Sequence, residues 1–158
     1  MSRSLLGLSV GWLLALTSHS AMHAQAAPRF QNPATLPIPR GYSQLVDVPP
    51  GHRMIFLSGQ VALDTAGKVV GPSDFQAQAV QVFENIRLGL AAVGATFADV
   101  IKLNFYVLDV AQVGLLRQVR DRYVNMSAPP ASTLVEVRRL FRDDILLEVE
   151  AVAVARPR

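Results

Sequence analysis

Two carboxylates near the end of the chain are the side chains best suited to chemistry. Glu148 and Glu150 stand two residues apart in a mostly apolar segment, residues 146–155, that is typical of a strand. Alternate residues of a strand share a face, so the two carboxylates would lie about 7 Å apart on one side of it. A carboxylate with a raised pKa can act as a general acid and base, and a solvated pair on an exposed face is the alternative interpretation.

The composition argues against several other kinds of site. The 158 residues include no cysteine, which excludes disulfides, thiolate metal sites and a cysteine nucleophile. Only three histidines are present, His19, His23 and His52, so a site with several histidine ligands is not expected. The formal net charge of +3 comes without a dense basic cluster, which argues against nucleic-acid binding. We therefore expect no metal, no cofactor and no nucleic-acid partner.

The first 26 residues have the pattern of a signal peptide. Arg3 precedes a mostly apolar run at 5–16, and Ala24-Gln25-Ala26 supplies the small residues that signal peptidase requires. The run is shorter than the ~20 residues that span a bilayer. The sequence thus predicts cleavage after Ala26, a periplasmic or secreted protein, and no stable membrane insertion afterwards. An uncleaved anchor or a misassigned start codon are the alternatives.

Short strands and one proline-rich arm make up the first part of the remaining chain. Residues 27–40 hold four prolines and predict an extended N-terminal arm. Residues 43–48 and 53–57 are typical of strands. The Pro49-Pro50-Gly51-His52 turn between them predicts that they form a hairpin.

Two helices are expected downstream of these strands. Ser73 predicts a helix start, with Gln76 three residues later as its capping-box partner. An apolar stripe with spacings of three and four then continues to Val93, and Gly94 ends the helix. A second helix is predicted from Ala111 to Met126.

Strands at 101–107, 132–137 and 146–155 complete the pattern. The order strand, strand, helix, strand, helix, strand, strand predicts an α+β fold with two helices covering one face of a mixed sheet. The apolar second half of the last strand, 151–155, suggests that the other face is covered too. Self-association is the economical way to cover that face and to cap exposed sheet edges.

Seven short motifs stand in a recognisable order along residues 41–155. They are Gly41-Tyr42-Ser43-Gln44, Ser58-Gly59-Gln60-Val61, the segment from Gln78 to Asn85-Ile86, Asp99-Val100-Ile101-Lys102, Tyr106-Val107-Leu108-Asp109, Pro130-Ala131-Ser132-Thr133-Leu134-Val135-Glu136-Val137 and Leu147-Glu148-Val149-Glu150-Ala151-Val152-Ala153. No single motif is specific, but the series resembles the reactive intermediate deaminase (Rid, RidA or YjgF-like) family. We therefore expect a Rid-like domain at 41–158.

This resemblance implies a chorismate-mutase-like α+β protomer that forms a homotrimer with small-molecule clefts between subunits. The archetypes of the family hydrolyse imines and enamines, such as 2-aminoacrylate, to a keto acid and ammonia. In these archetypes, an arginine in a Pro-Ala-Arg-Ser segment holds the substrate carboxylate, and a glutamate on the last strand positions water.

The sequence departs from the family at the carboxylate-binding arginine, where it has Ser132. A guanidinium donates two parallel charge-assisted hydrogen bonds to a carboxylate, whereas a serine hydroxyl donates one neutral bond. We therefore expect either a substrate without a simple α-carboxylate or a weak activity. Arg120 and Arg122, or Arg138 and Arg139, are candidates to replace the missing cation from a neighbouring subunit.

The resemblance also assigns roles to the candidate site residues. Glu148 matches the water-positioning glutamate and is the candidate catalytic residue. Tyr42 matches a cleft tyrosine, with an aromatic packed at a strand edge as the alternative. Gly59 is a candidate backbone contact to the ligand, or the glycine of a tight bend. Ser132 and Thr133 either donate hydroxyls to a neutral polar ligand or are ordinary strand residues.

The prediction is thus an imine or enamine deaminase-type hydrolase that acts on a small molecule. Two alternatives remain, a trimer that binds a metabolite without catalysis and a chaperone-like trimer.

Overall fold

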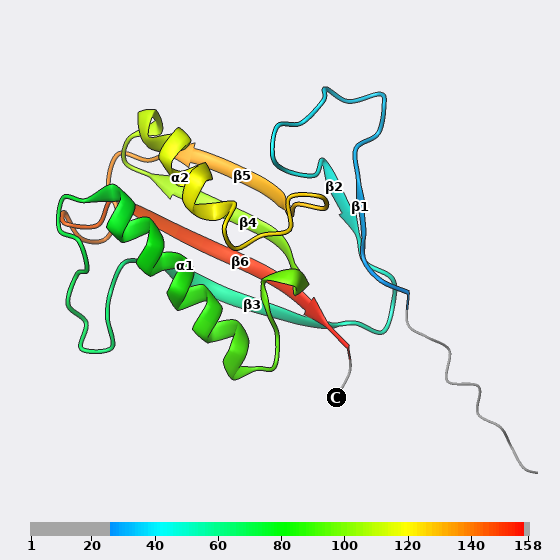
Figure 1. The fold of residues 1–158 in the computed structure, drawn as a ribbon, viewed down its shortest axis with the longest axis horizontal. Helices are drawn as coiled ribbons and strands as arrows, with labels where there is room; N and C mark the ends of the chain where they lie inside the picture. Colours follow the sequence, from blue (N-terminus) through cyan, green and yellow to red (C-terminus); the bar gives the residue numbers. More distant parts are fainter. Residues whose placement is uncertain (1–25, 157–158) are drawn as a thin grey trace, which may run out of the picture.

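The structure, a computed structural model, describes residues 26–156, so the predicted leader lies outside the described residues except for Ala26. It contains a mixed four-stranded sheet, two α-helices on one face of that sheet, and a separate two-stranded sheet (Figure 1). The elements are β1 (Arg29–Gln31), β2 (Leu45–Asp47), β3 (Arg53–Gln60), α1 (Phe75–Ala92), η1 (Phe97–Asp99), β4 (Val100–Val107), η2 (Val110–Gln112), α2 (Val113–Arg120), β5 (Ala131–Glu136) and β6 (Leu147–Ala155).

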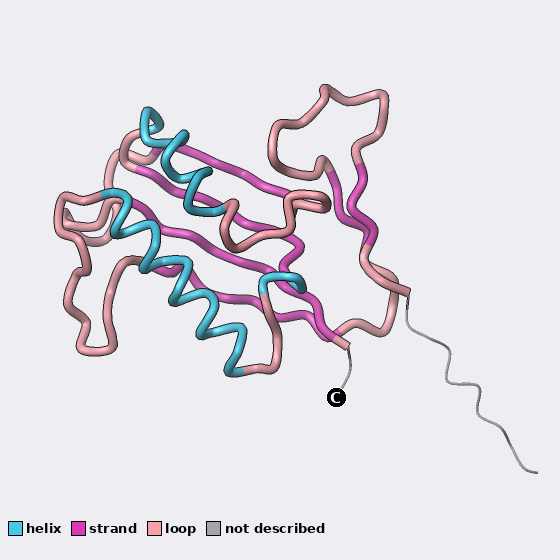
Figure 2. Tube along the Cα trace, viewed as in Figure 1, coloured by secondary structure: helices cyan, strands magenta, loops and turns pink. Residues whose placement is uncertain are grey.

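The strand order of the main sheet is β3-β6-β4-β5. β6 is antiparallel to both of its neighbours, and β4 is parallel to β5, so the expected α+β fold with a mixed sheet is confirmed. Both helices lie on the same side of this sheet (Figure 2). Within residues 26–156, no helix has the length and apolar content needed to cross a membrane.

The predicted hairpin between 43–48 and 53–57 is wrong. β2 pairs instead with β1, where Val46 lies opposite Phe30, and β3 pairs with β6, where Ile55 lies opposite Ala153. Two consecutive prolines fix the backbone and remove two N–H donors, so the chain changes direction there without a ladder. The arm at 27–40 accordingly contains a strand.

The two helices also differ from the predicted bounds. Asp74, not Ser73, caps α1: its carboxylate accepts a hydrogen bond from the Ala77 N–H at 3.0 Å, while Ser73 has a φ of +63°. An aspartate satisfies the free N–H groups and also complements the helix dipole. The predicted apolar stripe is nevertheless buried, at Phe75, Ala79, Val82, Phe83, Ile86 and Leu90.

α2 ends at Arg120 instead of Met126 because the chain turns there. The N–H groups of Tyr123 and Val124 both bond to the Arg120 carbonyl, at 2.9 and 3.2 Å. The turn directs the Tyr123 ring into the core, where it stacks on Phe83 with ring centroids 5.0 Å apart. Helical spacing therefore continues in the sequence beyond the end of the helix.

The alternation along β4 and β6 decides which side chains face the helices. Leu103 and Phe105 are buried toward the helices, whereas Asn104 lies on the opposite face beside Glu150. No described element covers this second face, which we call the open face. Phe56 on the open face is 75% exposed. The expectation that this face meets another molecule stays a prediction.

Candidate functional site

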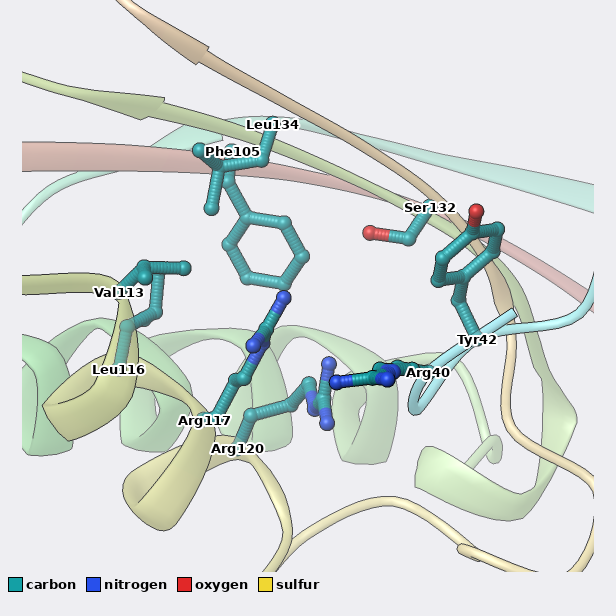
Figure 3. A pocket seen from close by; sticks show the side chains of 9 residues that line it. All are labelled: Arg40, Tyr42, Phe105, Val113, Leu116, Arg117, Arg120, Ser132 and Leu134. Atoms are coloured by element: carbon teal, nitrogen blue, oxygen red, sulfur yellow. The ribbon is translucent and has the colours of Figure 1, made fainter. Parts of the chain in front are cut away.

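A cavity of about 220 Å³ lies between α2, the start of β5 and the segment at 40–42 (Figure 3). Its volume is below the ~300–1,000 Å³ of pockets for drug-sized ligands, so it suits a small metabolite. The lining residues are Arg40, Tyr42, Phe105, Val113, Leu116, Arg117, Arg120, Ser132 and Leu134. Two of the predicted site residues, Tyr42 and Ser132, are thereby brought together.

Ser43 holds Tyr42 beside Ser132. The Ser43 side chain is buried, its Oγ donates to the Pro129 carbonyl at 2.6 Å, and its N–H donates to the Pro130 carbonyl at 3.2 Å. These bonds attach the segment around Tyr42 to the strand that bears Ser132.

Arg120 enters the cavity from α2 of the same chain, whereas the sequence suggested a contribution from a neighbouring subunit. The residue is only 7% exposed, and its Nε and Nη2 donate to Asp121 Oδ1 at 2.8 and 2.6 Å. Gly41, with a φ of +80°, passes so close that a Cβ there would lie 2.7 Å from Arg120 Nη2. A glycine is therefore required where the backbone crosses the guanidinium.

Two further arginines of this cavity, Arg40 and Arg117, were missed by the sequence analysis. In residues 26–156, neither side chain forms a hydrogen bond or an ion pair. Arg117 and Arg120 are three residues apart, which puts both on one helix face, and this spacing could have identified Arg117. Nothing local to Arg40 indicates that it meets them.

The other candidate cations are elsewhere. Arg122 does not line the cavity, and neither does Arg138. Arg139 is exposed and pairs with Asp143 at 3.8 Å.

A second group of predicted residues, Gly59 and Glu148, meets on the open face. A Cβ at position 59 would lie 1.7 Å from Glu148 Oε1 and 2.6 Å from its Cδ. The pairing of β3 with β6 shifts register between Leu57 and Gln60, so Gly59 sits in a bulge. The bend expected at Gly59 is thus present, and the group that approaches its backbone is Glu148.

Glu148 and Glu150 differ in their environments. Glu150 Oε2 accepts hydrogen bonds from Tyr106 OH at 3.0 Å and from Asn104 Nδ2 at 3.2 Å. The bond to Glu150 raises the pKa of Tyr106. The Glu148 carboxylate has no hydrogen-bond partner in residues 26–156, and burial, followed by the charge of Glu150, raises its pKa above 4.5. Of the pair, Glu148 is the carboxylate free to act on a bound molecule.

Thr133 does not share a cavity with Ser132. Ser132 pairs with Leu103 on the helix-facing side, whereas Thr133 pairs with Asn104 and its Oγ1 accepts from Lys102 Nζ at 2.7 Å. Neighbouring residues of a strand point to opposite faces. For the same reason Tyr42 and Ser132 are separated by the sheet from Gly59 and Glu148 within one chain.

The raised pKa of Glu148 predicts a pH-dependent effect on stability. Ionisation of Glu148 costs more in the folded protein than in the unfolded chain, so it subtracts stability as the pH rises through the folded-state pKa. Glu148→Gln should therefore be more stable than wild type at pH 7, and this advantage should shrink as the pH falls through the raised folded-state pKa and be gone below 4.5. Urea unfolding from pH 4 to pH 8 measures the effect.

The exposed Asp143→Asn is the matched control for that series, since its side chain is 94% exposed. A stability advantage of Glu148→Gln that does not change with pH would contradict the prediction.

No group of three or more histidine, aspartate or glutamate side chains in residues 26–156 could hold a metal ion.

Comparisons with known proteins agree with the architecture. The family model described as Endoribonuclease L-PSP matches residues 34–155. The chain is 36% identical to Protein DfrA of Myxococcus xanthus over 138 residues, which cover 87% of this chain and 97% of that one. It is 31% identical over 116 residues to TdcF of Escherichia coli, which is named as a reactive intermediate deaminase, covering 72% of this chain and 85% of TdcF.

A solved structure is also similar. YyfB of Yersinia pestis, described as a protein of unknown function of the conserved Rid family, superposes with a TM-score of 0.72. The sequence identity is 31%, and the match covers 82% of this chain and all of YyfB.

Proposed function

The chain belongs to the Rid (YjgF-like) family, and from that premise we propose that it hydrolyses a small imine or enamine and releases ammonia. The observation that supports this proposal is the state of Glu148: a partly buried carboxylate with a raised pKa and no hydrogen-bond partner in the described residues. A general base needs this combination of a free acceptor and a pKa moved toward the working pH.

The proposed reaction is the addition of water to the C=N carbon followed by loss of ammonia. Glu148 accepts a proton from water as the water oxygen attacks the C=N carbon, and it passes this proton to the imine nitrogen, which gives a carbinolamine. Glu148 then accepts the remaining hydroxyl proton and delivers it to the nitrogen as the C–N bond breaks, so that both protons of the water leave with ammonia. The products are a ketone, or a keto acid, and one molecule of ammonia.

We also propose that the protein is a homotrimer. Two features of the chain support this assembly: the uncovered open face with its exposed Phe56, and the separation of the two candidate groups by the sheet. A neighbouring subunit that packs on the open face would bring its own Tyr42 and Ser132 to Glu148. Light scattering of the purified protein measures the mass of the assembly, and a monomer would contradict the proposal.

We further propose a periplasmic or secreted location. The charge and apolar pattern of residues 1–26 supports it, and the family match begins only at residue 34. Mass spectrometry of the protein exported by a Gram-negative host would detect cleavage after Ala26.

Imines produced by an amino-acid oxidase provide the direct test of the activity. The chain from residue 27 is mixed with the oxidase and amino acids, and the release of ammonia is compared with spontaneous hydrolysis. Acceleration that increases with protein concentration supports the proposal. Thermal stabilisation by the product acids without acceleration would instead favour a binding module, and suppression of client aggregation by a cleft-blocked variant would favour a chaperone.

The description of the family model as an endoribonuclease does not extend our proposal to RNA. His52 is the single histidine of residues 26–156, and its Nδ1 lies 2.8 Å from the Pro49 carbonyl in a turn. One histidine does not supply the acid and base pair of histidine-dependent RNA cleavage.

A further inference from the structure

The cavity beside Ser132 contains an unusual concentration of positive charge. The side chains of Arg40, Arg117 and Arg120 extend toward one another and toward the space below Ser132 and Phe105 (Figure 3). Among residues 26–156, no acidic residue lines this cavity. Within the same range, Asp121, which bonds to Arg120 from outside the cavity, is the one carboxylate in contact with these guanidinium groups. Three positive charges and one negative charge leave a local excess of two positive charges.

The three arginines have different roles in the cavity. Arg120 is buried and held in a fixed position by Asp121 and by the backbone at Gly41, yet its Nη1 has no bond to a described residue. A fixed guanidinium loses little conformational entropy when it binds an anion. Arg40 and Arg117 are exposed, form no side-chain bond with the described residues, and can close on a ligand from two sides.

We propose that these three arginines form a binding site for a small dianion. They take the place of the strand arginine that the family archetypes have at the position of Ser132. The ligand carries two carboxylates or one phosphate group, because two uncompensated positive charges match two negative charges. This inference rests on the proposed function for its place in a reaction, since the dianion would be part of the imine substrate. It replaces the expectation of a substrate without a carboxylate.

Arg117 and Arg120 belong to a helix and not to the sheet, and this determines the side from which they approach a ligand. An arginine on β5 would approach a ligand from the sheet, whereas Arg117 and Arg120 approach from α2 across the cavity. The space between them and the sheet remains open beside the Ser132 hydroxyl (Figure 3). A charged group can therefore bind between helix and strand, with this hydroxyl as an additional donor.

Calorimetric titration of the intact protein at pH 8 tests the inference with three probes: succinate, inorganic phosphate and propionate. We expect at least one dianion to bind about tenfold or more tightly than propionate, since a second charge-assisted contact of ~1.4 kcal/mol is worth that factor. Stronger binding of succinate would identify a dicarboxylate, and stronger binding of phosphate would identify a phosphate monoester.

Variants separate the cavity from general surface charge. Arg117→Gln removes an exposed cavity guanidinium and should weaken binding of the dianion about tenfold. Arg122→Gln removes the same charge nearby, outside the cavity, and should change the affinity by less than about twofold. Arg120→Gln should weaken binding of the dianion further. Equal binding of all three probes, no binding of any probe, or an equal loss in Arg117→Gln and Arg122→Gln would overturn the inference.

The titration and the hydrolysis assay can fail independently. Dianion binding that depends on Arg117, without ammonia release from any imine, would leave this site standing and reject the proposed function. Hydrolysis of imines from alanine and from aspartate at equal rates, unchanged in Arg117→Gln, would support the proposed function and reject the dianion site.

Discussion

Glu148→Gln is expected to lower imine hydrolysis by about 10²- to 10⁴-fold, the usual contribution of a general acid and base. Glutamine keeps the shape of the side chain but can neither accept a proton from water nor return one to nitrogen. The loss should lie in kcat, with KM little changed, because the carboxylate acts on water and not on the substrate's charged group. Steady-state ammonia release by wild type and variant measures it.

Glu150→Gln is the matched control for this change. It removes the same charge from the same face of β6, two residues away, but from a carboxylate engaged by Asn104 and Tyr106. We expect less than about a tenfold effect on kcat. Equal losses in both variants would show that the charge of the face matters and not Glu148 itself.

The pH dependence of the wild-type rate follows from the same carboxylate. Glu148 must be ionised to accept a proton, so kcat should fall as the pH falls through its raised pKa. In Glu148→Gln this acid limb should be absent from the residual rate.

Gly59→Ala is expected to have the second largest effect, although it changes one hydrogen to a methyl group. The new Cβ would overlap the Glu148 carboxylate, at 1.7 Å from Oε1 and 2.9 Å from Cγ, so the whole side chain must move. A displacement of about 1 Å in a catalytic group can reduce the rate about 10²-fold. We expect less than about 1 kcal/mol of loss in the free energy of unfolding, because the displaced atoms are the end of a flexible, partly exposed side chain.

Gly114→Ala provides the control for glycine replacement. A Cβ at Gly114 would meet nothing within 4 Å, and the residue lies within α2. Alanine should stabilise the protein by up to about 1 kcal/mol through its helix propensity, and the rate of hydrolysis should not change. A Gly59→Ala variant as active as wild type would mean that the bulge does not position Glu148.

Local periodicity was sufficient for most of the fold. The alternation in β6 assigned Glu148 and Glu150 to one face of that strand, because each strand residue points away from its neighbours whatever the tertiary structure. The stripe in α1 likewise identified the helix that covers the sheet. Both patterns depend on interactions within one element.

The errors arose where partners distant in sequence decide the outcome. β2 and β3 each have a strand-like composition, but which strand each one pairs with depends on β1 and β6. α2 ends early because Tyr123 packs against Phe83 and Phe97, an interaction invisible to helical spacing.

For the candidate site, the sequence alone determined the residue types at the positions that the resemblance singled out: the carboxylate at Glu148, the glycine at position 59 and the serine at position 132. These follow from local pattern and from resemblance to the Rid family. Only the tertiary structure separated Thr133 from Ser132 and brought Arg40 to Arg117 and Arg120 in one cavity. The physical reason is that a cavity is formed by packing a helix and a loop on a strand, so its charge depends on contacts between segments far apart in the chain.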